Sequence, residues 1–343
     1  MQTAGSLSKQ RLIWMYTQML RIREFEERVK RTFVEHPGVI RGHAHLGDGA
    51  EASIVGSLAT RQENDLVMPS YRCHGYPIVL GTDPRKLMAE IYQRKDGVCK
   101  GFGGSMHLAD PAHHFPTASG IIGQGIAHAA GAAYAAQVKK TGQVVYSFFG
   151  DGSSKQGAFY ETLNLAAVWK LPVVFVLENN SYQAYTHISL EDANAIAGDP
   201  LSQKAKAFSI PGVTVDGTDP LKVYDVVAEA AERARAGKGP SLVESKFYRL
   251  SPHGNAITVP PVPTQFQEHE AIEVYGNKPE FQAAKENDPN PKFRKHLIAT
   301  GALTDAGASK IEADVRAEME EVVKFALASP LPAPEDAVNY VWA

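Results

Sequence analysis

Two short apolar runs, each followed by a polar residue, constrain the fold of this chain more than any other feature of its sequence. The run from 143 to 149 precedes Asp151, and the run from 172 to 177 precedes Asn180. Between them, residues 156–170 repeat apolar side chains at helical spacing. A strand that is buried on both faces of a parallel sheet has such a continuous apolar run. The unit is therefore predicted to be strand, helix, strand with a right-handed crossover, as in α/β folds.

Asp151 and Asn180 are candidate ligands at the ends of these two strands. In a parallel sheet, ligands bind outside the carboxyl ends of the strands, where both side chains are expected. Magnesium prefers oxygen ligands and usually binds one or two side chains together with phosphate oxygens. Gly150 and Gly152 would let the backbone approach a phosphate, and the next helix would offer free amide groups. The pattern predicts a magnesium site that carries a diphosphate, although a tight turn alone also favours glycine and aspartate.

Apolar periodicity organises the rest of the chain as one α/β domain over residues 1–343. We expect helices over 8–33, 123–138, 221–236 and around 311–322, and a strand over 241–247. A helical N-terminal part, 8–60, and a helical C-terminal part, 279–330, are expected to pack on this domain. The segment 250–266 contains four prolines and little periodicity, which is typical of a loop.

Composition excludes several classes of protein. A content of 44% hydrophobic and 21% charged residues is typical of a globular protein, and a net charge of -3 gives no basic surface for nucleic acid or an anionic membrane. No apolar run reaches the roughly 18 residues of a membrane-spanning helix, and residues 1–11 lack the apolar core of a signal peptide. Two cysteines, Cys73 and Cys99, cannot define a disulfide framework. We therefore expect a cytoplasmic protein.

Six motifs, in order along the chain, resemble those of one family. They lie at 41–46, 71–75, 100–107, 120–123, 150–152 with 179–180, and 248–249 ahead of His253. The family is the alpha subunit of the thiamine diphosphate-dependent first component of 2-oxo acid dehydrogenase complexes, which includes the pyruvate, branched-chain and acetoin enzymes. The resemblance runs from about Met19 to Gly254 and continues more weakly to 334–337.

The resemblance implies a thiamine diphosphate-binding fold, a parallel sheet flanked by helices with a C-terminal helical extension, and a site for thiamine diphosphate and Mg²⁺. The residues that match the family's cofactor-binding positions are His45, Tyr71, Arg72, Gly120, Ile122, Gly150, Asp151, Gly152, Ser153, Asn180 and Tyr182. The implied metal ligands are Asp151, Asn180 and the backbone carbonyl of Tyr182. Three histidines match positions that line the active-site channel: His253, His45 and His74. Among them, His253 is the strongest catalytic candidate.

The activity implied by the resemblance is oxidative decarboxylation of a small 2-oxo acid, with transfer of the acyl group to lipoamide on a separate lipoyl acyltransferase. The cofactor ring serves as the electron sink. In this family a beta subunit supplies the glutamate that activates the cofactor. Because 343 residues leave room for one diphosphate-binding domain and no evident second one, we expect two alpha and two beta subunits with the cofactor at their interfaces.

Some residues depart from the family pattern, so the sequence does not identify the substrate. His43 stands where the family usually has an apolar residue, Ala50 replaces a usual glutamine, and residues 254–257 replace a serine-rich stretch after the channel histidine. Acetoin dehydrogenase, or another thiamine-dependent enzyme that cleaves C–C bonds with the same subunit type, is the alternative function. A transketolase-like transferase, or a scaffold that binds the cofactor without turnover, fits fewer of the motifs.

Overall fold

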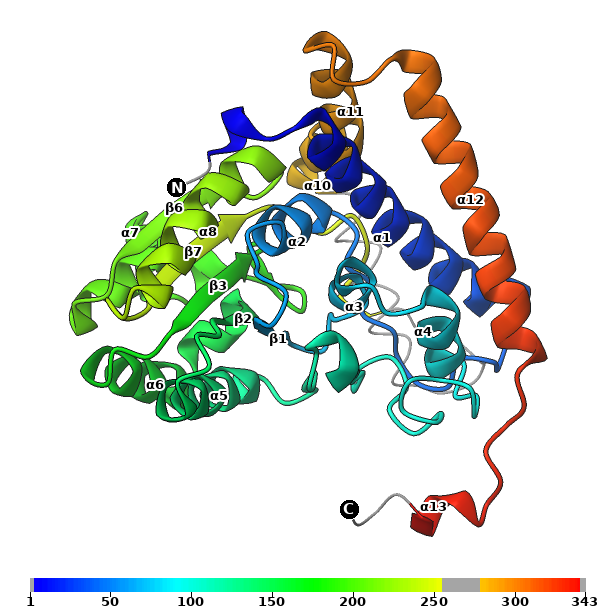
Figure 1. Cartoon of the computed structure of the whole chain (residues 1–343), viewed down its shortest axis with the longest axis horizontal. Coiled ribbons are helices and arrows are strands. Elements are labelled where there is room, and N and C mark those ends of the chain that lie inside the picture. Colours follow the sequence, from blue (N-terminus) through cyan, green and yellow to red (C-terminus); the bar gives the residue numbers. More distant parts are fainter. Residues whose placement is uncertain (1–2, 255–277, 340–343) are drawn as a thin grey trace.

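The fold is built on a five-stranded parallel sheet, seen in a computed structural model that describes residues 3–254 and 278–339 (Figure 1). The strand order is β1-β2-β3-β7-β6. The strands are β1 (Leu66–Met68), β2 (Val145–Gly150), β3 (Val173–Asn179), β7 (Ser241–Lys246) and β6 (Gly212–Asp216). Neighbours in this order are all parallel, so their carboxyl ends share one edge of the sheet. The α/β fold and the parallel sheet predicted from the sequence are confirmed.

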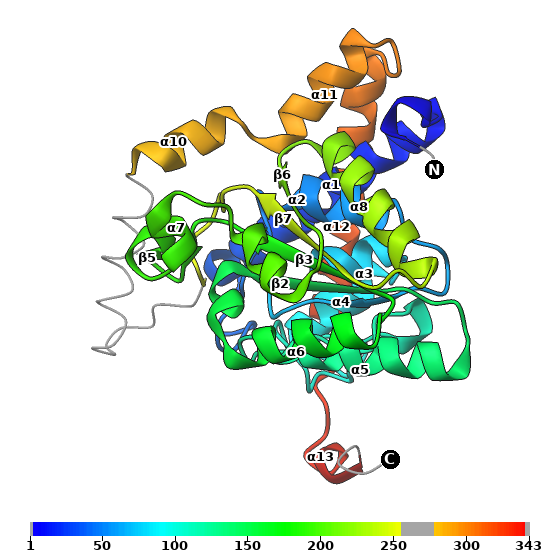
Figure 2. The ribbon, with the colours of Figure 1, turned by 90° about the vertical axis from the view of Figure 1, so that its left-hand side faces the viewer.

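Helices cover both faces of the sheet. Figure 2 shows α5 (Gln124–Lys139) and α6 (Gly157–Val168) side by side along one face, with α8 (Pro220–Arg235) on the other. Side chains of β2 alternate between the two faces: Val145 and Phe149 pack in the α5–α6 core, while Tyr146 and Phe148 pack in the core that includes α8. Because both faces are buried, the strand has the continuous apolar run seen in the sequence.

The remaining helices pack mainly around the α8 side and are listed here with their bounds: α1 (Lys9–Glu35), α2 (Glu51–Leu58), α3 (Gly75–Leu80), α4 (Pro84–Ile91), α10 (Pro279–Glu286), α11 (Pro289–Ala299), α12 (Asp305–Ala328) and α13 (Asp336–Asn339). The long helices α1 and α12 lie side by side (Figure 1). Arg21 joins them through a two-pronged hydrogen bond to Glu318, at 2.9 and 2.7 Å. Within the described ranges, none of the helices is both long and apolar enough to cross a membrane.

Short elements form the connections at the ends of the sheet. They are the 3-10 helices Ala4–Ser6, Pro111–His113, Asp151–Lys155, Ile188–Leu190 and Leu201–Phe208, the helix α7 (Ala193–Ala197), and the hairpin of β4 (Tyr182–Gln183) and β5 (Thr186–His187). The sequence pattern located α1, α5, α6, α8 and the strands β2, β3 and β7 to within a few residues, but it missed the strands β1 and β6 and the short helices α3 and α4. Most of the predicted loop 250–266 lies outside the described residues.

Candidate active site

A cavity of about 230 Å³ opens at the carboxyl edge of the sheet, where several motifs meet. Tyr71 follows β1, Asp151 follows β2, Asn180 follows β3 and Arg249 follows β7. The residues that line the cavity are Ser70, Tyr71, Arg72, Ile122, Gly150, Asp151, Gly152, Ser153, Glu178, Asn180, Tyr182, Gln183, Ala184, Phe247, Arg249 and His253. Segments far apart in the sequence thus converge because parallel strands end at the same edge.

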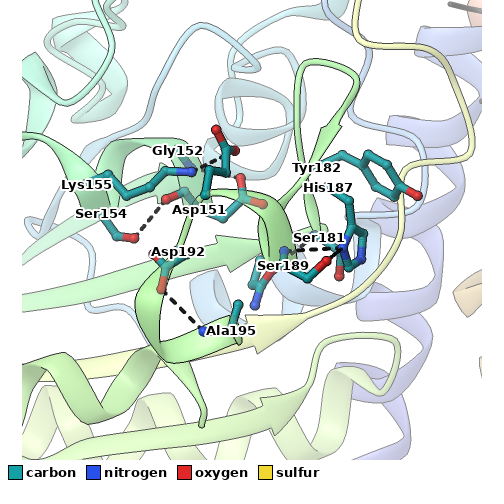
Figure 3. Close-up of polar contacts among 12 residues, drawn as sticks. Asp151, Gly152, Ser154, Lys155, Ser181, Tyr182, His187, Ser189, Asp192 and Ala195 are labelled. Carbon is teal, nitrogen blue, oxygen red and sulfur yellow. Dashed lines mark hydrogen bonds and ion pairs between the residues drawn. The ribbon is translucent and has the colours of Figure 1, made fainter. Parts of the chain in front are cut away.

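Asp151 presents a buried carboxylate to this cavity. Its side chain is 3% exposed, and Oδ1 accepts a hydrogen bond from the backbone N–H of Gly152 at 2.9 Å. Oδ2 has no hydrogen-bond partner among the described residues. Burial raises the pKa of Asp151 from an ordinary 3.8 to about 6. Ser154 steadies the turn, since its hydroxyl donates to the Asp151 carbonyl at 2.8 Å (Figure 3).

Asn180 lies across the cavity in a strained turn. Its Oδ1 accepts a hydrogen bond from the backbone N–H of Tyr182 at 3.2 Å. Ser181 and Ala184 have left-handed backbone angles, with φ of 66° and 50°, which cost energy for residues other than glycine. The Tyr182 hydroxyl donates to Glu280 at 2.6 Å, so its side chain anchors the turn to α10.

The donor set of this cavity fits a magnesium ion that is bound together with a diphosphate. Asp151 offers a buried oxygen without a partner, and Asn180 offers a carboxamide. Within residues 3–254 and 278–339, no group of three or more His, Cys, Asp or Glu side chains could hold a metal ion by itself. A single carboxylate with an amide is therefore an incomplete shell for Mg²⁺, and phosphate oxygens and water are the usual complement.

Two buried arginines place positive charge on the cavity wall. Arg72 donates to the carbonyl oxygens of Leu46 and His253, the latter at 3.2 Å. Arg249 is 1% exposed and donates to the Ala184 carbonyl at 2.6 Å. A guanidinium carries five donors, so Arg72 keeps N–H groups beyond these two contacts for an anionic ligand.

Glu178 is a cavity residue that sequence reasoning missed. It is 5% exposed, and burial raises its pKa from 4.5 to about 7. A glutamate inside an apolar strand, directly before Asn179, was the available signal, because a charged residue is rarely buried without a functional or structural partner.

The structure brings two of the three predicted histidines together. The rings of His45 and His253 are 5.0 Å apart between centroids, and Tyr71 lies 4.6 Å from His45. Burial, with the Arg72 charge as the next cause, lowers the pKa of His45 to about 2 and that of His253 to about 3. Both imidazoles are therefore neutral at physiological pH.

His74 is not among the residues that line the cavity. Its ring is 0% exposed, with Nδ1 2.7 Å from Glu26 Oε2 and Nε2 2.9 Å from Ser105 Oγ. The other oxygen of Glu26 accepts from the backbone N–H of Gly47 at 2.8 Å. This buried network ties α1 to two of the motifs and to Gly47, which directly follows a third, so in the structure His74 holds these segments together.

Gly120 is likewise absent from the cavity lining, whereas Ile122 contributes to it. A Cβ at Gly120 would lie 2.9 Å from Nε2 of His107, closer than real Cβ atoms come. A side chain at this position would displace the exposed ring of His107, and the predicted cofactor role of Gly120 stays a prediction.

Replacing His74 with alanine is expected to lower the free energy of unfolding by about 3 kcal/mol. The change leaves the Glu26 carboxylate buried without its main partner, and breaking a buried pair in this way is strongly destabilising. Urea denaturation followed by circular dichroism would measure the loss.

His113 provides the matched control for that experiment. Its Nδ1 also lies 2.7 Å from a carboxylate, Oδ2 of Asp110, but its side chain is 42% exposed. His113→Ala should cost about 1 kcal/mol or less, because exposed pairs contribute little. Equal losses in the two variants would contradict the role of burial.

An exposed apolar surface covers the outer side of two helices that flank the cavity. We define the α5–α6 face by its large apolar side chains: Tyr134, Val138, Leu165, Val168 and Trp169. The rings of Tyr134 and Trp169 lie 5.2 Å apart between centroids. Ile121 and the cavity residue Ile122 directly precede α5 and are also exposed. A contiguous apolar surface of this kind is typical of a protein contact.

Comparison with known proteins supplies the family context. The profile described as the dehydrogenase E1 component matches residues 17–335. The alpha subunit of acetoin:2,6-dichlorophenolindophenol oxidoreductase from Bacillus subtilis is 41% identical over 98% of this chain and 95% of the relative. The subunit of the same name from Cupriavidus necator is 40% identical over 98% and 95%. The pyruvate dehydrogenase E1 component subunit alpha from Zymomonas mobilis is 38% identical over 96% and 87%.

Proposed function

The chain belongs to the dehydrogenase E1 component family, and we propose on that basis that it is the alpha subunit of a thiamine diphosphate-dependent 2-oxo acid dehydrogenase. It decarboxylates a small 2-oxo acid and passes the acyl group to lipoamide. The observation that carries the proposal is the partnerless Oδ2 of Asp151 in a cavity at the carboxyl edge of the sheet. That oxygen and the Asn180 amide suit the metal ion of a diphosphate cofactor.

Residue roles follow from these positions. Asp151, Asn180 and the Tyr182 carbonyl hold Mg²⁺, and Arg72 and the backbone from Gly150 to Ser153 bind the diphosphate. Thiamine diphosphate, when bound, supplies the reactive carbon and the electron sink for cleavage next to a carbonyl. Tyr71 and Ile122 line the walls of the cavity and exclude water from it. His45 and His253 contribute neutral imidazoles at the substrate end.

A second candidate is the alpha subunit of an acetoin dehydrogenase. Two of the relatives above carry acetoin in their names, at 41% and 40% identity, against 38% for a pyruvate relative. His43 adds a polar ring 6.4 Å from that of His45, at a position that is usually apolar. Both functions use the same cofactor site, so the two enzymes would differ in the substrate that binds beside these histidines.

Co-expression with a cognate beta chain, followed by a substrate screen with an artificial electron acceptor, tests the proposal. Pyruvate, branched-chain 2-oxo acids and acetoin would be compared by kcat/KM. Preferred turnover of a 2-oxo acid supports the proposal, and preferred turnover of acetoin supports the second candidate. Ketol transfer between sugars would favour a transketolase-like enzyme, and cofactor binding without any turnover would favour a scaffold.

A beta subunit is the partner that membership of this family implies. We propose an assembly of two alpha and two beta subunits that passes its product to a lipoyl acyltransferase, and we place the beta contact on the α5–α6 face. Helix α5 runs from this face to Ile121 and Ile122 at the cavity, so a subunit docked along α5 would reach the cofactor site. Next to Tyr134 on the helix, α5 also exposes the small residues Gly131 and Ala135, which allow close approach of a partner helix.

Val168→Asp is expected to weaken binding of the beta chain about tenfold or more. A carboxylate buried in an apolar contact without a partner costs at least the roughly 1.4 kcal/mol that a factor of ten requires. Sedimentation analysis of mixed chains would measure the dissociation constant.

Val34→Asp is the matched control, since Val34 is a similarly exposed valine at the end of α1, away from the α5–α6 face. It should leave the association unchanged. Equal effects of the two substitutions would argue against this face.

The location we propose is the cytoplasm. Both cysteines are free thiols, which suits a reducing compartment. Fractionation of cells that express the native protein would test this location.

A further inference from the structure

The contact between Arg249 and His253 fixes which ring nitrogen carries the proton. Nη1 of Arg249 lies 3.1 Å from Nδ1 of His253. A guanidinium has donors and no acceptor, and it stays protonated in proteins. Nδ1 must therefore accept the hydrogen bond. Because a neutral imidazole carries one N–H, that proton resides on Nε2.

Arg249 cannot easily leave this contact. It is 1% exposed, and its Nη2 donates to the Ala184 carbonyl at 2.6 Å. Ala184 is itself held in a left-handed turn, so the guanidinium is fixed between two segments that follow different strands. The arrangement therefore rests on contacts within the fold.

The charged groups that act most on the His253 ring are cations, and neutral rings lie beside it, while the carboxylates of Asp151 and Glu178 line the same cavity. Arg72 donates to the His253 carbonyl oxygen at 3.2 Å, and His43 adds to the positive environment. The rings of His45, Tyr71 and Tyr185 lie 5.0, 6.0 and 6.1 Å from that of His253. None of these cations and rings carries a negative charge that would favour an imidazolium.

We infer that Arg249 is a positioning residue that holds His253 as its neutral Nε2–H tautomer, so that His253 donates a hydrogen bond into the cavity instead of acting as an imidazolium acid. The acceptor is a carbonyl or alkoxide oxygen of the substrate or of the acyl group in transfer, a role that rests on the proposed function. The proton stays on Nε2 throughout, and no bond to His253 forms or breaks. The lowered pKa of His253, caused first by burial, agrees with this assignment.

The tautomer can be measured without turnover. The assembled enzyme would be labelled with ¹⁵N-histidine, and the His253 signals identified by their loss in His253→Gln. The expected spectrum has one protonated and one unprotonated ring nitrogen between about pH 6 and about pH 8. In Arg249→Met the pKa of His253 should rise by about one unit, because one of the nearby like charges is removed. A doubly protonated ring in the unaltered enzyme, or a proton on Nδ1, would overturn the inference.

Two histidine variants test the same assignment through activity. A glutamine carboxamide can place its N–H near the position of Nε2, whereas the shorter asparagine reaches only the position of Nδ1. His253→Gln should therefore keep a kcat roughly a hundredfold above that of His253→Asn, the loss typical of one donor to developing negative charge. Equal loss in the two variants would contradict the donor role.

The two readouts separate this inference from the proposed function. If the unaltered enzyme turned over none of the screened substrates, the proposed function would fail, and the nitrogen spectrum would still decide the tautomer. If turnover were found together with a charged His253, the proposed function would stand and the role of Arg249 would fall.

Discussion

Asp151→Asn is expected to abolish tight binding of thiamine diphosphate with Mg²⁺, with a loss of affinity of a thousandfold or so. The substitution keeps the shape of the side chain but removes the charge that faces the ion. A bound cation dominates the electrostatics of such a site, so the loss should amount to several kcal/mol. Calorimetric titration of the assembled enzyme would measure it, and unchanged affinity would refute the assignment of the site.

The same substitution should make the metal-free chain more stable at neutral pH. Burial raises the pKa of Asp151 to about 6 in the fold, against 3.8 as the ordinary value, so the folded chain binds this proton more tightly than the unfolded chain. The contribution of Asp151 to the free energy of unfolding is therefore most favourable below pH 3.8 and is lost as the pH rises through about 6. Above that value the ionised carboxylate costs about 3 kcal/mol, which asparagine avoids.

Urea denaturation of the metal-free chain at two pH values would measure this gain. The variant should be more stable than the unaltered chain at pH about 8 and similar to it near pH about 4, where the carboxyl is largely protonated. A loss of stability at the higher pH would show that Asp151 is held by contacts other than those seen here.

The chain alone is expected to show less than about one hundredth of the turnover that it shows with its beta partner. The family resemblance implies that the activating glutamate comes from the beta subunit, and positioned acid–base groups typically contribute factors of roughly 10² to 10⁴. Glu178 does not replace it, because it directly precedes the Asn179-Asn180 pair, at the end of the cavity where we propose that the diphosphate binds.

Steady-state assays with an artificial acceptor, at equal alpha-chain concentration with and without the beta chain, would measure the ratio. Size-exclusion chromatography of each sample serves as the control for assembly. Comparable rates in the two samples would show that the chain carries a complete active site.

The core of the fold could be predicted from sequence because its signals are local. The apolar runs of β2 and β3, with a helix between them, identify a crossover unit that is buried on both faces. The same pattern placed Asp151 and Asn180 at one edge of the sheet, since parallel strands end together. β1 was missed because three residues are too few to show a period, and β6 because its first three residues are exposed at the sheet edge.

The residue pairs that give the site its chemistry come from different motifs. His74 and His45 are both motif histidines, yet one is buried against Glu26 and the other lies beside His253. Nothing in the local sequence distinguishes these two histidines. Which of them is buried against Glu26 depends on which side of residues 71–75 packs against α1.

The sequence by itself therefore determined the type of fold, the edge of the sheet at which the cavity lies and the position of the carboxylate that we propose faces the metal, all of which follow from neighbouring residues and strand order. Only the tertiary structure decided that Glu178 is buried in the cavity and that His74 is buried between Glu26 and Ser105. It also decided how Arg249, held by the Ala184 carbonyl, sets the proton on His253. These outcomes depend on burial and on contacts between segments distant in sequence, which no local pattern encodes.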